Sequence, residues 1–190
     1  MNDAVEQAVL AVQQGDTRAF GTLYDRYVRQ IYKFIYIKTY DKETTEDITS
    51  LTFTKALEHL KTFDLAKGTF QSWLYGIARN AVTDHYRKVR PTVPLDDVWD
   101  LRDNGHIEQD TDGKIKLERV KEYLEKLSAG EREIILMRVW GEMSYHEIAA
   151  ALGKSEDGSK MSYSRAIRKL RELMPLAAYL AFILQHPHSL

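Results

Sequence analysis

The chain has 190 residues, of which 44% are hydrophobic and 29% are charged, a composition typical of a globular protein able to bury a core. It contains no cysteine, which excludes disulfide bonds and thiolate metal sites and fits a reducing cytoplasm, where we expect the protein. The net charge is −1, but the charges are unevenly distributed, so the local balance carries more information than the total.

Neither end of the chain predicts insertion into a membrane. The N-terminal segment lacks the basic stretch and the long apolar run of a signal peptide. The longest apolar run, "PLAAYLAFIL" at 175–184, has about half the length of a membrane-spanning helix. We therefore expect no stable membrane insertion.

Helical periodicity runs through the first 90 residues, and no alternating strand pattern appears. In "GDTRAFGTLYDRYVRQIYKFIYIK" the apolar residues are three or four apart, and Asp16 is placed as the N-cap. A second helix starts in "DKETTEDITSLTFTKALEHL", where Thr44 and Asp47 fit an acidic variant of a capping box. The stretch "KTFDLAKGT" predicts a loop, and a third long helix follows over 68–88.

This third helix, "GTFQSWLYGIARNAVTDHYRK", interleaves aromatic rings with cations. On a helical wheel the predicted core face consists of Phe70, Trp73, Leu74, Ile77 and Ala81. The opposite side is predicted to be an exposed strip of Tyr75, Arg79, Thr83 and Tyr86. Such a strip is either a merely solvated face or a platform for unstacked bases, because rings stack on bases while cations follow phosphates.

Residues 91–113 hold seven acids, a single base and two prolines, which predicts an acidic linker. A second helical block extends from about Lys114 to Met174, where Pro175 interrupts it. The sequence thus predicts an all-α protein of two helical domains, 1–90 and 114–174, with a C-terminal extension at 175–190.

The second block carries the pattern of a helix-turn-helix. Ser144 and Glu147 fit a capping box, and Gly153 stands where the turn needs a residue tolerant of positive φ. Ser155 is then predicted to cap a basic second helix, whose N-terminal residues would meet base edges in the major groove. The basic residues of this helix are Lys160, Arg165, Arg168 and Lys169. A corner of this kind also occurs in helical bundles that bind no DNA.

Two residues depart from a regular helix-turn-helix. Ser159 stands where an inward apolar residue is usual, and Gly158 weakens a helix by about 1 kcal/mol. We therefore expect the first turn of the second helix to be irregular.

These segments resemble the extracytoplasmic-function group of bacterial sigma factors of the sigma-70 family. The three helices up to Lys88 resemble their domain 2, and "LSAGEREIILMRVWGEMSYHEIAAALGKSEDGSKMSYSRAIRKLREL" resembles their domain 4. The resemblance implies a protein that is no enzyme and needs no cofactor or metal. It implies instead that core RNA polymerase and promoter DNA are its partners, and that an anti-sigma factor or other regulator controls it.

The resemblance also implies roles for single residues. DNA contacts at the −10 element fall on Lys67, Tyr75, Arg79, Asn80, Arg87 and Lys88. Contacts to the −35 duplex fall on Ser155, Lys160, Arg165, Arg168 and Lys169, in a segment that departs from the usual pattern at Gly158, Ser159 and Ser162. Polymerase contacts fall on Glu46, Asp47, Thr52, Phe53 and Lys55.

Three alternatives stay open at this point. The acidic linker either threads into the polymerase or is only a tether. The apolar extension either packs back onto domain 4, docks a regulator or touches a membrane surface. Finally, a stand-alone helix-turn-helix regulator, which binds intact duplex without polymerase, is the rival to the sigma-factor interpretation.

Overall fold

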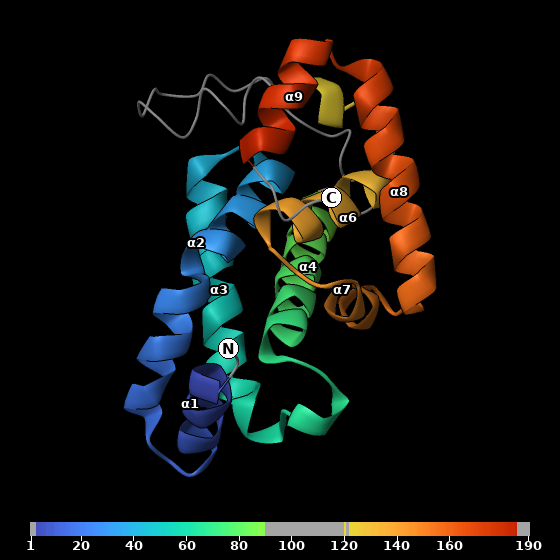
Figure 1. The fold of residues 1–190 in the computed structure, drawn as a ribbon. Helices are drawn as coiled ribbons and strands as arrows, with labels where there is room; N and C mark the ends of the chain where they lie inside the picture. The colour runs from blue at the N-terminus through green and yellow to red at the C-terminus, as the bar shows by residue number, and fades with distance from the viewer. Residues whose placement is uncertain (1–2, 90–119, 121, 186–190) are drawn as a thin grey trace.

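The computed structural model describes residues 3–89, 120 and 122–185, and every regular element within these ranges is a helix, as predicted (Figure 1). The first part contains α1 (Asp3–Gln13), η1 (Thr17–Ala19), α2 (Phe20–Thr39), α3 (Lys42–His59), η2 (Leu60–Thr62), η3 (Leu65–Lys67) and α4 (Phe70–Val89). The second part contains α6 (Ala129–Ile135), the π-helical turn η5 (Leu136–Trp140), α7 (Tyr145–Leu152), α8 (Glu156–Leu173) and α9 (Leu176–Gln185).

The long helices α2, α3 and α4 pack together, and α1 lies across one end of them (Figure 1). On α2, Leu23, Tyr27, Ile31 and Ile35 are buried, and their four-residue spacing explains the amphipathic stripe seen in the sequence. Phe70 and Leu74 bury the facing side of α4. These side chains form the centre of the bundle that holds α4 in place.

Two helix starts differ from the sequence prediction. Asp16 caps the short turn η1 through the backbone N–H of Arg18, and α2 begins only at Phe20 without a side-chain cap. For α3 the N-cap is Asp41, whose side chain accepts a hydrogen bond of 2.7 Å from the N–H of Thr44. The predicted capping box of Thr44 and Asp47 is therefore wrong by one turn.

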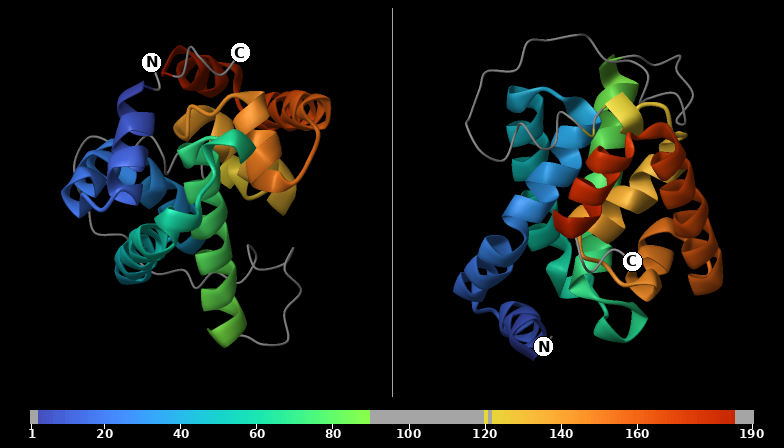
Figure 2. Two further views of the ribbon diagram at one scale, coloured as in Figure 1. Left: turned by 90° about the horizontal axis from the view of Figure 1, so that it is seen from below. Right: turned by 45° about the horizontal axis from the view of Figure 1, so that its top comes forward.

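The helices α6, α7 and α8 form a second unit, hereafter the helix-turn-helix unit (residues 129–173). It packs on α4 and α2, so that α4 lies between α2 and α3 on one side and α6 and α7 on the other (Figures 1 and 2). Buried residues of both parts form one continuous core. The predicted boundaries at 1–90 and 114–174 stay a prediction, and the predicted linker at 91–113 lies outside the described residues.

The C-terminal extension folds as α9 after Pro175. Its Phe182 is almost fully buried and lies 5.9 Å, between ring centroids, from Trp140 of η5. The opposite face exposes Leu176, Leu180 and Leu184. Packing back onto the second unit is thus confirmed for one face of the extension only. Within the described residues no helix is both long enough and apolar enough to cross a bilayer.

Candidate nucleic-acid interface

The basic end of α4 is open to solvent. Asn80, Arg87 and Lys88 are exposed, and no ion pair or hydrogen bond involves their side chains within the described part of the chain. They therefore present donors and positive charge from one helix. Arg87 and Lys88 stand in its last turn, where cations also complement the helix dipole.

The middle of α4 is covered, contrary to the sequence prediction. Tyr75 is fully buried and packs edge-on against Phe34 at 5.0 Å between centroids. Arg79, Thr83 and Tyr86 are only half exposed, and the Tyr86 hydroxyl donates to the backbone carbonyl of Lys38 at 3.0 Å. The predicted exposed strip is therefore wrong for this structure, because the wheel considered a single helix, whereas α2 and the helix-turn-helix unit both pack on this side of α4.

A buried carboxylate accounts for part of this cover. Glu133 of α6 accepts a hydrogen bond of 2.6 Å from the ammonium group of Lys38 on α2. Its other oxygen lies 3.3 Å from Nε of Arg79 on α4. We call these three residues the closing contact. Lys38 and Glu133 are both almost fully buried, and breaking a buried ion pair of this kind by removing one partner costs about 3–5 kcal/mol.

The charges of the closing contact set its protonation. Burial alone would raise the pKa of Glu133, but the charges and hydrogen bonds of Lys38 and Arg79 outweigh burial and hold the pKa below its usual value. Burial lowers the pKa of Lys38, although Glu133 opposes that change. The carboxylate is consequently ionised at neutral pH and neutralises part of the positive charge on α4.

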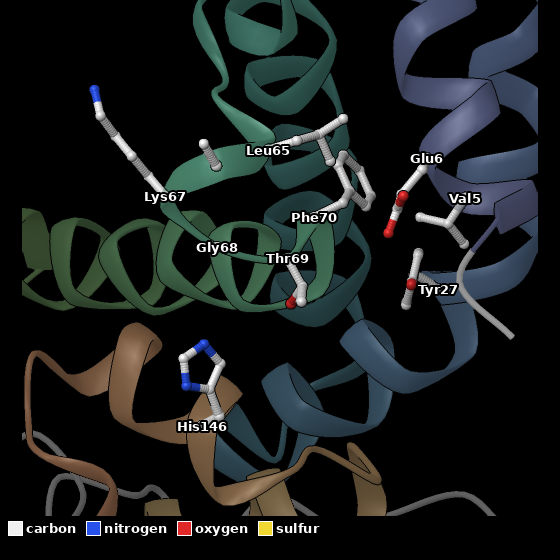
Figure 3. Close-up of a pocket in the computed structure, with 10 residues that line it drawn as sticks. Val5, Glu6, Tyr27, Leu65, Lys67, Gly68, Thr69, Phe70 and His146 are labelled. Carbon is white, nitrogen blue, oxygen red and sulfur yellow. The ribbon is translucent and has the colours of Figure 1, made fainter.

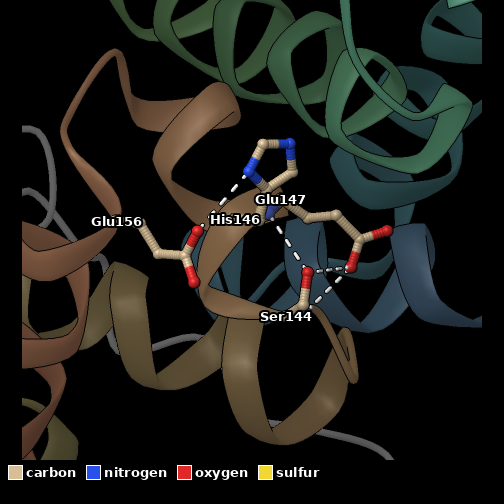
Figure 4. Close-up of polar contacts among 4 residues, drawn as sticks. All are labelled: Ser144, His146, Glu147 and Glu156. Carbon is tan, nitrogen blue, oxygen red and sulfur yellow. Dashed lines mark hydrogen bonds and ion pairs between the residues drawn. The ribbon is translucent and has the colours of Figure 1, made fainter.

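Two further hydrogen bonds join α4 to the helix-turn-helix unit. The side-chain amide of Gln71 donates to the carbonyl of Gly141 at 2.6 Å. The hydroxyl of Thr69, just before α4, donates to Oε1 of Glu147 at 3.0 Å. Glu147 also completes the capping box with Ser144 at the start of α7 (Figure 4). The carboxylate of Glu147 therefore takes part in the N-terminal cap of α7 and also links α7 to Thr69, just before α4.

The loop before α4 borders a pocket of about 350 Å³. The pocket lies where α1, this loop and α7 meet, with Glu6, Tyr27 and His146 among its lining residues (Figure 3). Lys67 extends from the rim into solvent, where it pairs with Asp64 at 3.5 Å. The predicted −10 residue Lys67 is thus accessible, unlike Tyr75.

The helix-turn-helix has the geometry that the sequence predicted. Gly153 adopts a left-handed conformation, with φ of 64°, between α7 and α8. Ser155 caps α8, and its Oγ accepts a hydrogen bond from the N–H of Gly158 at 3.1 Å. A Cβ at position 158 would stand 2.8 Å from that oxygen, so the glycine leaves room for the cap. The helix is regular from Glu156, and the expectation of an irregular first turn is wrong.

The basic residues of α8 differ in their availability. Lys160, Arg165 and Arg168 are exposed. Lys169 is engaged at 3.0 Å by Glu131, the capping-box carboxylate of α6. Ser159 is buried, and its hydroxyl has no hydrogen-bond partner among the described residues. Met161 on the same helix is also exposed, and its backbone carbonyl accepts a hydrogen bond of 3.4 Å from Nε of Arg165.

The predicted polymerase-contact residues also differ in exposure. Glu46 and Asp47 are exposed on α3, and Lys55 is half exposed, 3.9 Å from Asp84. Thr52 and Phe53 are buried instead: the hydroxyl of Thr52 bonds to the carbonyl of Ile48, and Phe53 packs 4.8 Å from Tyr24. A direct polymerase contact by these two side chains is therefore wrong for this structure, whereas Tyr24 and Leu51 are exposed beside them.

Both parts of this chain match known protein families. Residues 23–92 match the family described as Sigma-70 region 2, and residues 117–170 match Sigma-70, region 4. The ECF RNA polymerase sigma factor BldN of Streptomyces coelicolor is 33% identical over 180 residues, which are 92% of this chain and 66% of BldN. The chain thus spans slightly less than two thirds of that relative. The sigma factor CnrH of Cupriavidus metallidurans is 31% identical over 186 residues, 92% of this chain and 97% of CnrH.

Solved structures agree with these matches. CnrH in complex with the cytosolic domain of CnrY superimposes with a TM-score of 0.69 at 27% identity, over 90% of this chain and 96% of that chain. The sigma factor RpoE in complex with the anti-sigma factor NepR from Bartonella quintana has the same fold, with a TM-score of 0.65 at 24% identity over 81% and 95% of the two chains.

Proposed function

The chain belongs to the extracytoplasmic-function group of the sigma-70 family, and from this premise we propose that it binds core RNA polymerase and directs it to specific promoters. In this proposal α4 and the loop before it hold the −10 element as a melted strand, while α8 reads the −35 element as duplex. The protein performs no chemistry on the DNA. The observation that carries the proposal is the presence of two helices with exposed cations in one chain: α4 in the first helical bundle and α8 in the helix-turn-helix unit.

The −10 role rests on α4. Asn80, Arg87 and Lys88 are exposed on this helix, and Lys67 is exposed on the loop before it. Cations at such positions neutralise phosphates, and amide groups bond to base edges that a melted strand exposes. Arg79 and Tyr75 belong to the same proposed surface, but in this structure Arg79 is paired with Glu133 and Tyr75 is buried.

The −35 role rests on the exposed side of α8. Its capped N-terminus and the exposed Lys160, Arg165 and Arg168 form the cationic face that a recognition helix presents to the major groove. Met161 lies on this face and is 60% exposed. An exposed methionine on a basic helix suits apolar contact with a thymine methyl group, so we include it among the base-reading residues.

A protein inhibitor is part of the proposal. CnrH was solved in complex with the cytosolic domain of CnrY, and the match to this CnrH structure covers 90% of the present chain. We propose a partner of this kind for the present protein. For polymerase we propose the exposed part of α3, with Glu46 and Asp47, together with the neighbouring Lys55.

One experiment tests the proposed function. Purified core RNA polymerase is captured on the tagged full-length protein, and the resulting holoenzyme is used for run-off transcription on a library of promoter fragments. Capture of polymerase and discrete transcripts that depend on this protein are expected. Tight binding of the free protein to closed duplex without capture of polymerase would instead identify a stand-alone helix-turn-helix regulator.

A further inference from the structure

Helix α8 has one row of exposed side chains directly opposite its buried face. The buried face of the helix consists of Ser159, Tyr163, Ala166 and Leu170. Half a turn away, the spacing of four and three residues aligns Asp157, Met161 and Ser164, and all three are exposed. We call these three residues the reading row. Because the second helix of a helix-turn-helix lies in the major groove, the row that points away from the core of the unit points toward base edges.

Two exposed cations border the reading row. Lys160 precedes Met161 and Arg165 follows Ser164, so on the helix the two cations lie on opposite sides of the row. Cations at the edges of a recognition helix reach the phosphates that border the groove, and such contacts position the protein but carry no sequence information. Selection between sequences therefore falls to the reading row.

Asp157 is an acid on a helix that we assign to an acidic ligand. It belongs to the first turn of α8 together with Glu156. Glu156 lies 3.5 Å from Nδ1 of His146 on α7 (Figure 4), whereas the side chain of Asp157 has no ion pair or hydrogen bond within the described part of the chain. Because a carboxylate repels phosphates, Asp157 weakens DNA binding unless it accepts a hydrogen bond from a base.

The major groove offers a carboxylate one suitable partner. Cytosine presents the donor N4–H2 there without an acceptor beside it. Adenine also has an amino group, but its N7 acceptor stands next to that group and repels a carboxylate. Asp157 thus favours a C·G base pair. Met161, one turn further along α8, suits the methyl group of thymine.

We infer that Asp157 makes recognition of the −35 element specific for a cytosine, and that the reading row takes a C and a T about two base pairs apart. The separation follows from the helix: four residues correspond to about 6 Å along α8, and base pairs are stacked about 3.4 Å apart. The inference rests on the proposed −35 function of α8, which it deepens by naming the base pairs. Lys160 and Arg165 then hold phosphates and do not select bases.

The experiment measures base preference with the holoenzyme. The promoter that gives the strongest run-off transcript with the wild-type protein is randomised over its −35 region, and the fragments that the holoenzyme binds are sequenced. For the wild type we expect cytosine to be enriched about tenfold at one position, as a single base contact provides, with thymine enriched about two base pairs away on either strand. The preference for cytosine should be absent in Asp157→Ala.

Asp157→Asn is the sharpest variant. An asparagine amide both donates and accepts, which matches N6 and N7 of adenine, so the preferred base at this position should change from cytosine to adenine. Asparagine has nearly the same shape as aspartate and Asp157 is exposed, so a loss of folding does not explain such a change. Glu156→Gln is the matched control: it removes the same charge from the same turn and should keep the preference for cytosine.

Lys160→Ala separates positioning from reading. It should weaken binding of all fragments about equally and lower the salt dependence of binding by about one counterion, while the base preferences stay those of the wild type. Met161→Ser should remove only the preference for thymine.

The outcomes distinguish this inference from the proposed function. If transcription starts at specific promoters but the wild type has no preference for cytosine, or keeps it unchanged in Asp157→Ala and Asp157→Asn, the inference is wrong and the proposed function stands. An equal loss of preference in Glu156→Gln would also overturn the inference, because the charge of the first turn and not a base contact would then be the cause. If no transcript depends on this protein, the proposed function fails and the inference fails with it.

Discussion

The hydroxyl of Tyr75 lies directly beneath Gly141: a Cβ on that glycine would stand 2.7 Å from the Tyr75 oxygen and 2.5 Å from the carbonyl oxygen of Met137. The backbone of Gly141 is an ordinary right-handed one, with φ of −82°, so space and not conformation requires the glycine. The ring that we assign to the melted strand thus fits under the unit that covers it because position 141 has no side chain.

Gly141→Ala should therefore weaken the packing of the helix-turn-helix unit on α4. Overpacking of this kind costs about 1–3 kcal/mol, which a urea unfolding curve would show as a lower midpoint. Gly130→Ala is the control, because a Cβ at this helical position meets nothing within 4 Å and an alanine there should add about 0.5–1 kcal/mol. An equal midpoint for the two variants would contradict the close approach.

Tyr75→Phe should stabilise the free protein. The substitution keeps the ring in its contact with Phe34 and removes a buried hydroxyl that has no partner among the described residues. Relief of that unpaired group should be worth about 1 kcal/mol in the thermal unfolding of the chain.

Tyr86→Phe is the matched comparison, with the opposite sign. Its hydroxyl donates to the carbonyl of Lys38, so its loss should cost about 0.5–1.5 kcal/mol. If both substitutions shift the melting temperature in the same direction, the different bonding of the two hydroxyls is not the cause.

The sequence was sufficient for the elements that local chemistry determines. The capping box of Ser144 and Glu147, the left-handed Gly153 and the cap by Ser155 all follow from short-range patterns, and the structure contains each of them. The same patterns failed at Asp16, because a short 3-10 turn separates that residue from α2. A local motif is reliable when the helix begins directly after it.

The contacts between distant segments could not be predicted. Lys38 and Glu133 are 95 residues apart, and each looks like an ordinary surface charge on an amphipathic helix. Thr52 and Phe53 were assigned to polymerase by resemblance, although helical spacing puts them on the buried side of α3. For Tyr75 the wheel predicted an exposed side chain, but the ring packs against Phe34 of α2 and its hydroxyl lies next to Gly141, contacts that a single helix cannot show.

Acid should open the closing contact. In this structure the pKa of Glu133 lies below its ordinary value of 4.5, despite burial, since Lys38 and Arg79 favour the carboxylate. The folded protein with this contact thus binds fewer protons than the unfolded chain near this pH, so the stabilisation by the contact is fully present above pH 4.5 and is lost as the pH falls through the lowered value.

The measurement is the free energy of unfolding, from urea unfolding curves, as a function of pH. The wild type should keep the stabilisation by this contact at neutral pH and lose it only below pH 4.5. Other carboxylates also titrate in this range, so the relevant quantity is the difference from Glu133→Gln, which should lack the decrease assigned to this residue. If the free energies of the two proteins change in parallel with pH, Glu133 does not cause the loss.

The two faces of α9 should respond differently to substitution. Phe182 is buried against Trp140, so Phe182→Ala should lower the free energy of unfolding by about 3 kcal/mol or more. Leu184 is 80% exposed, and Leu184→Ser should leave stability within about 0.5 kcal/mol of the wild type. Urea unfolding of both variants tests the assignment, which fails if Phe182→Ala is as stable as Leu184→Ser.

Arg79 and Asn80 provide the test that separates strand capture from polymerase binding. Replacing both with alanine removes a cation and an amide from the proposed −10 surface but leaves Glu46, Asp47 and Lys55 unchanged. We expect the holoenzyme to assemble normally and to form almost no open complex, as measured by permanganate reactivity of unpaired thymines. Arg79→Ala also removes one cation from Glu133, so the substitution should in addition weaken the contact between α4 and α6. If polymerase binding decreases in parallel with open-complex formation, the two residues do not act specifically on the melted strand.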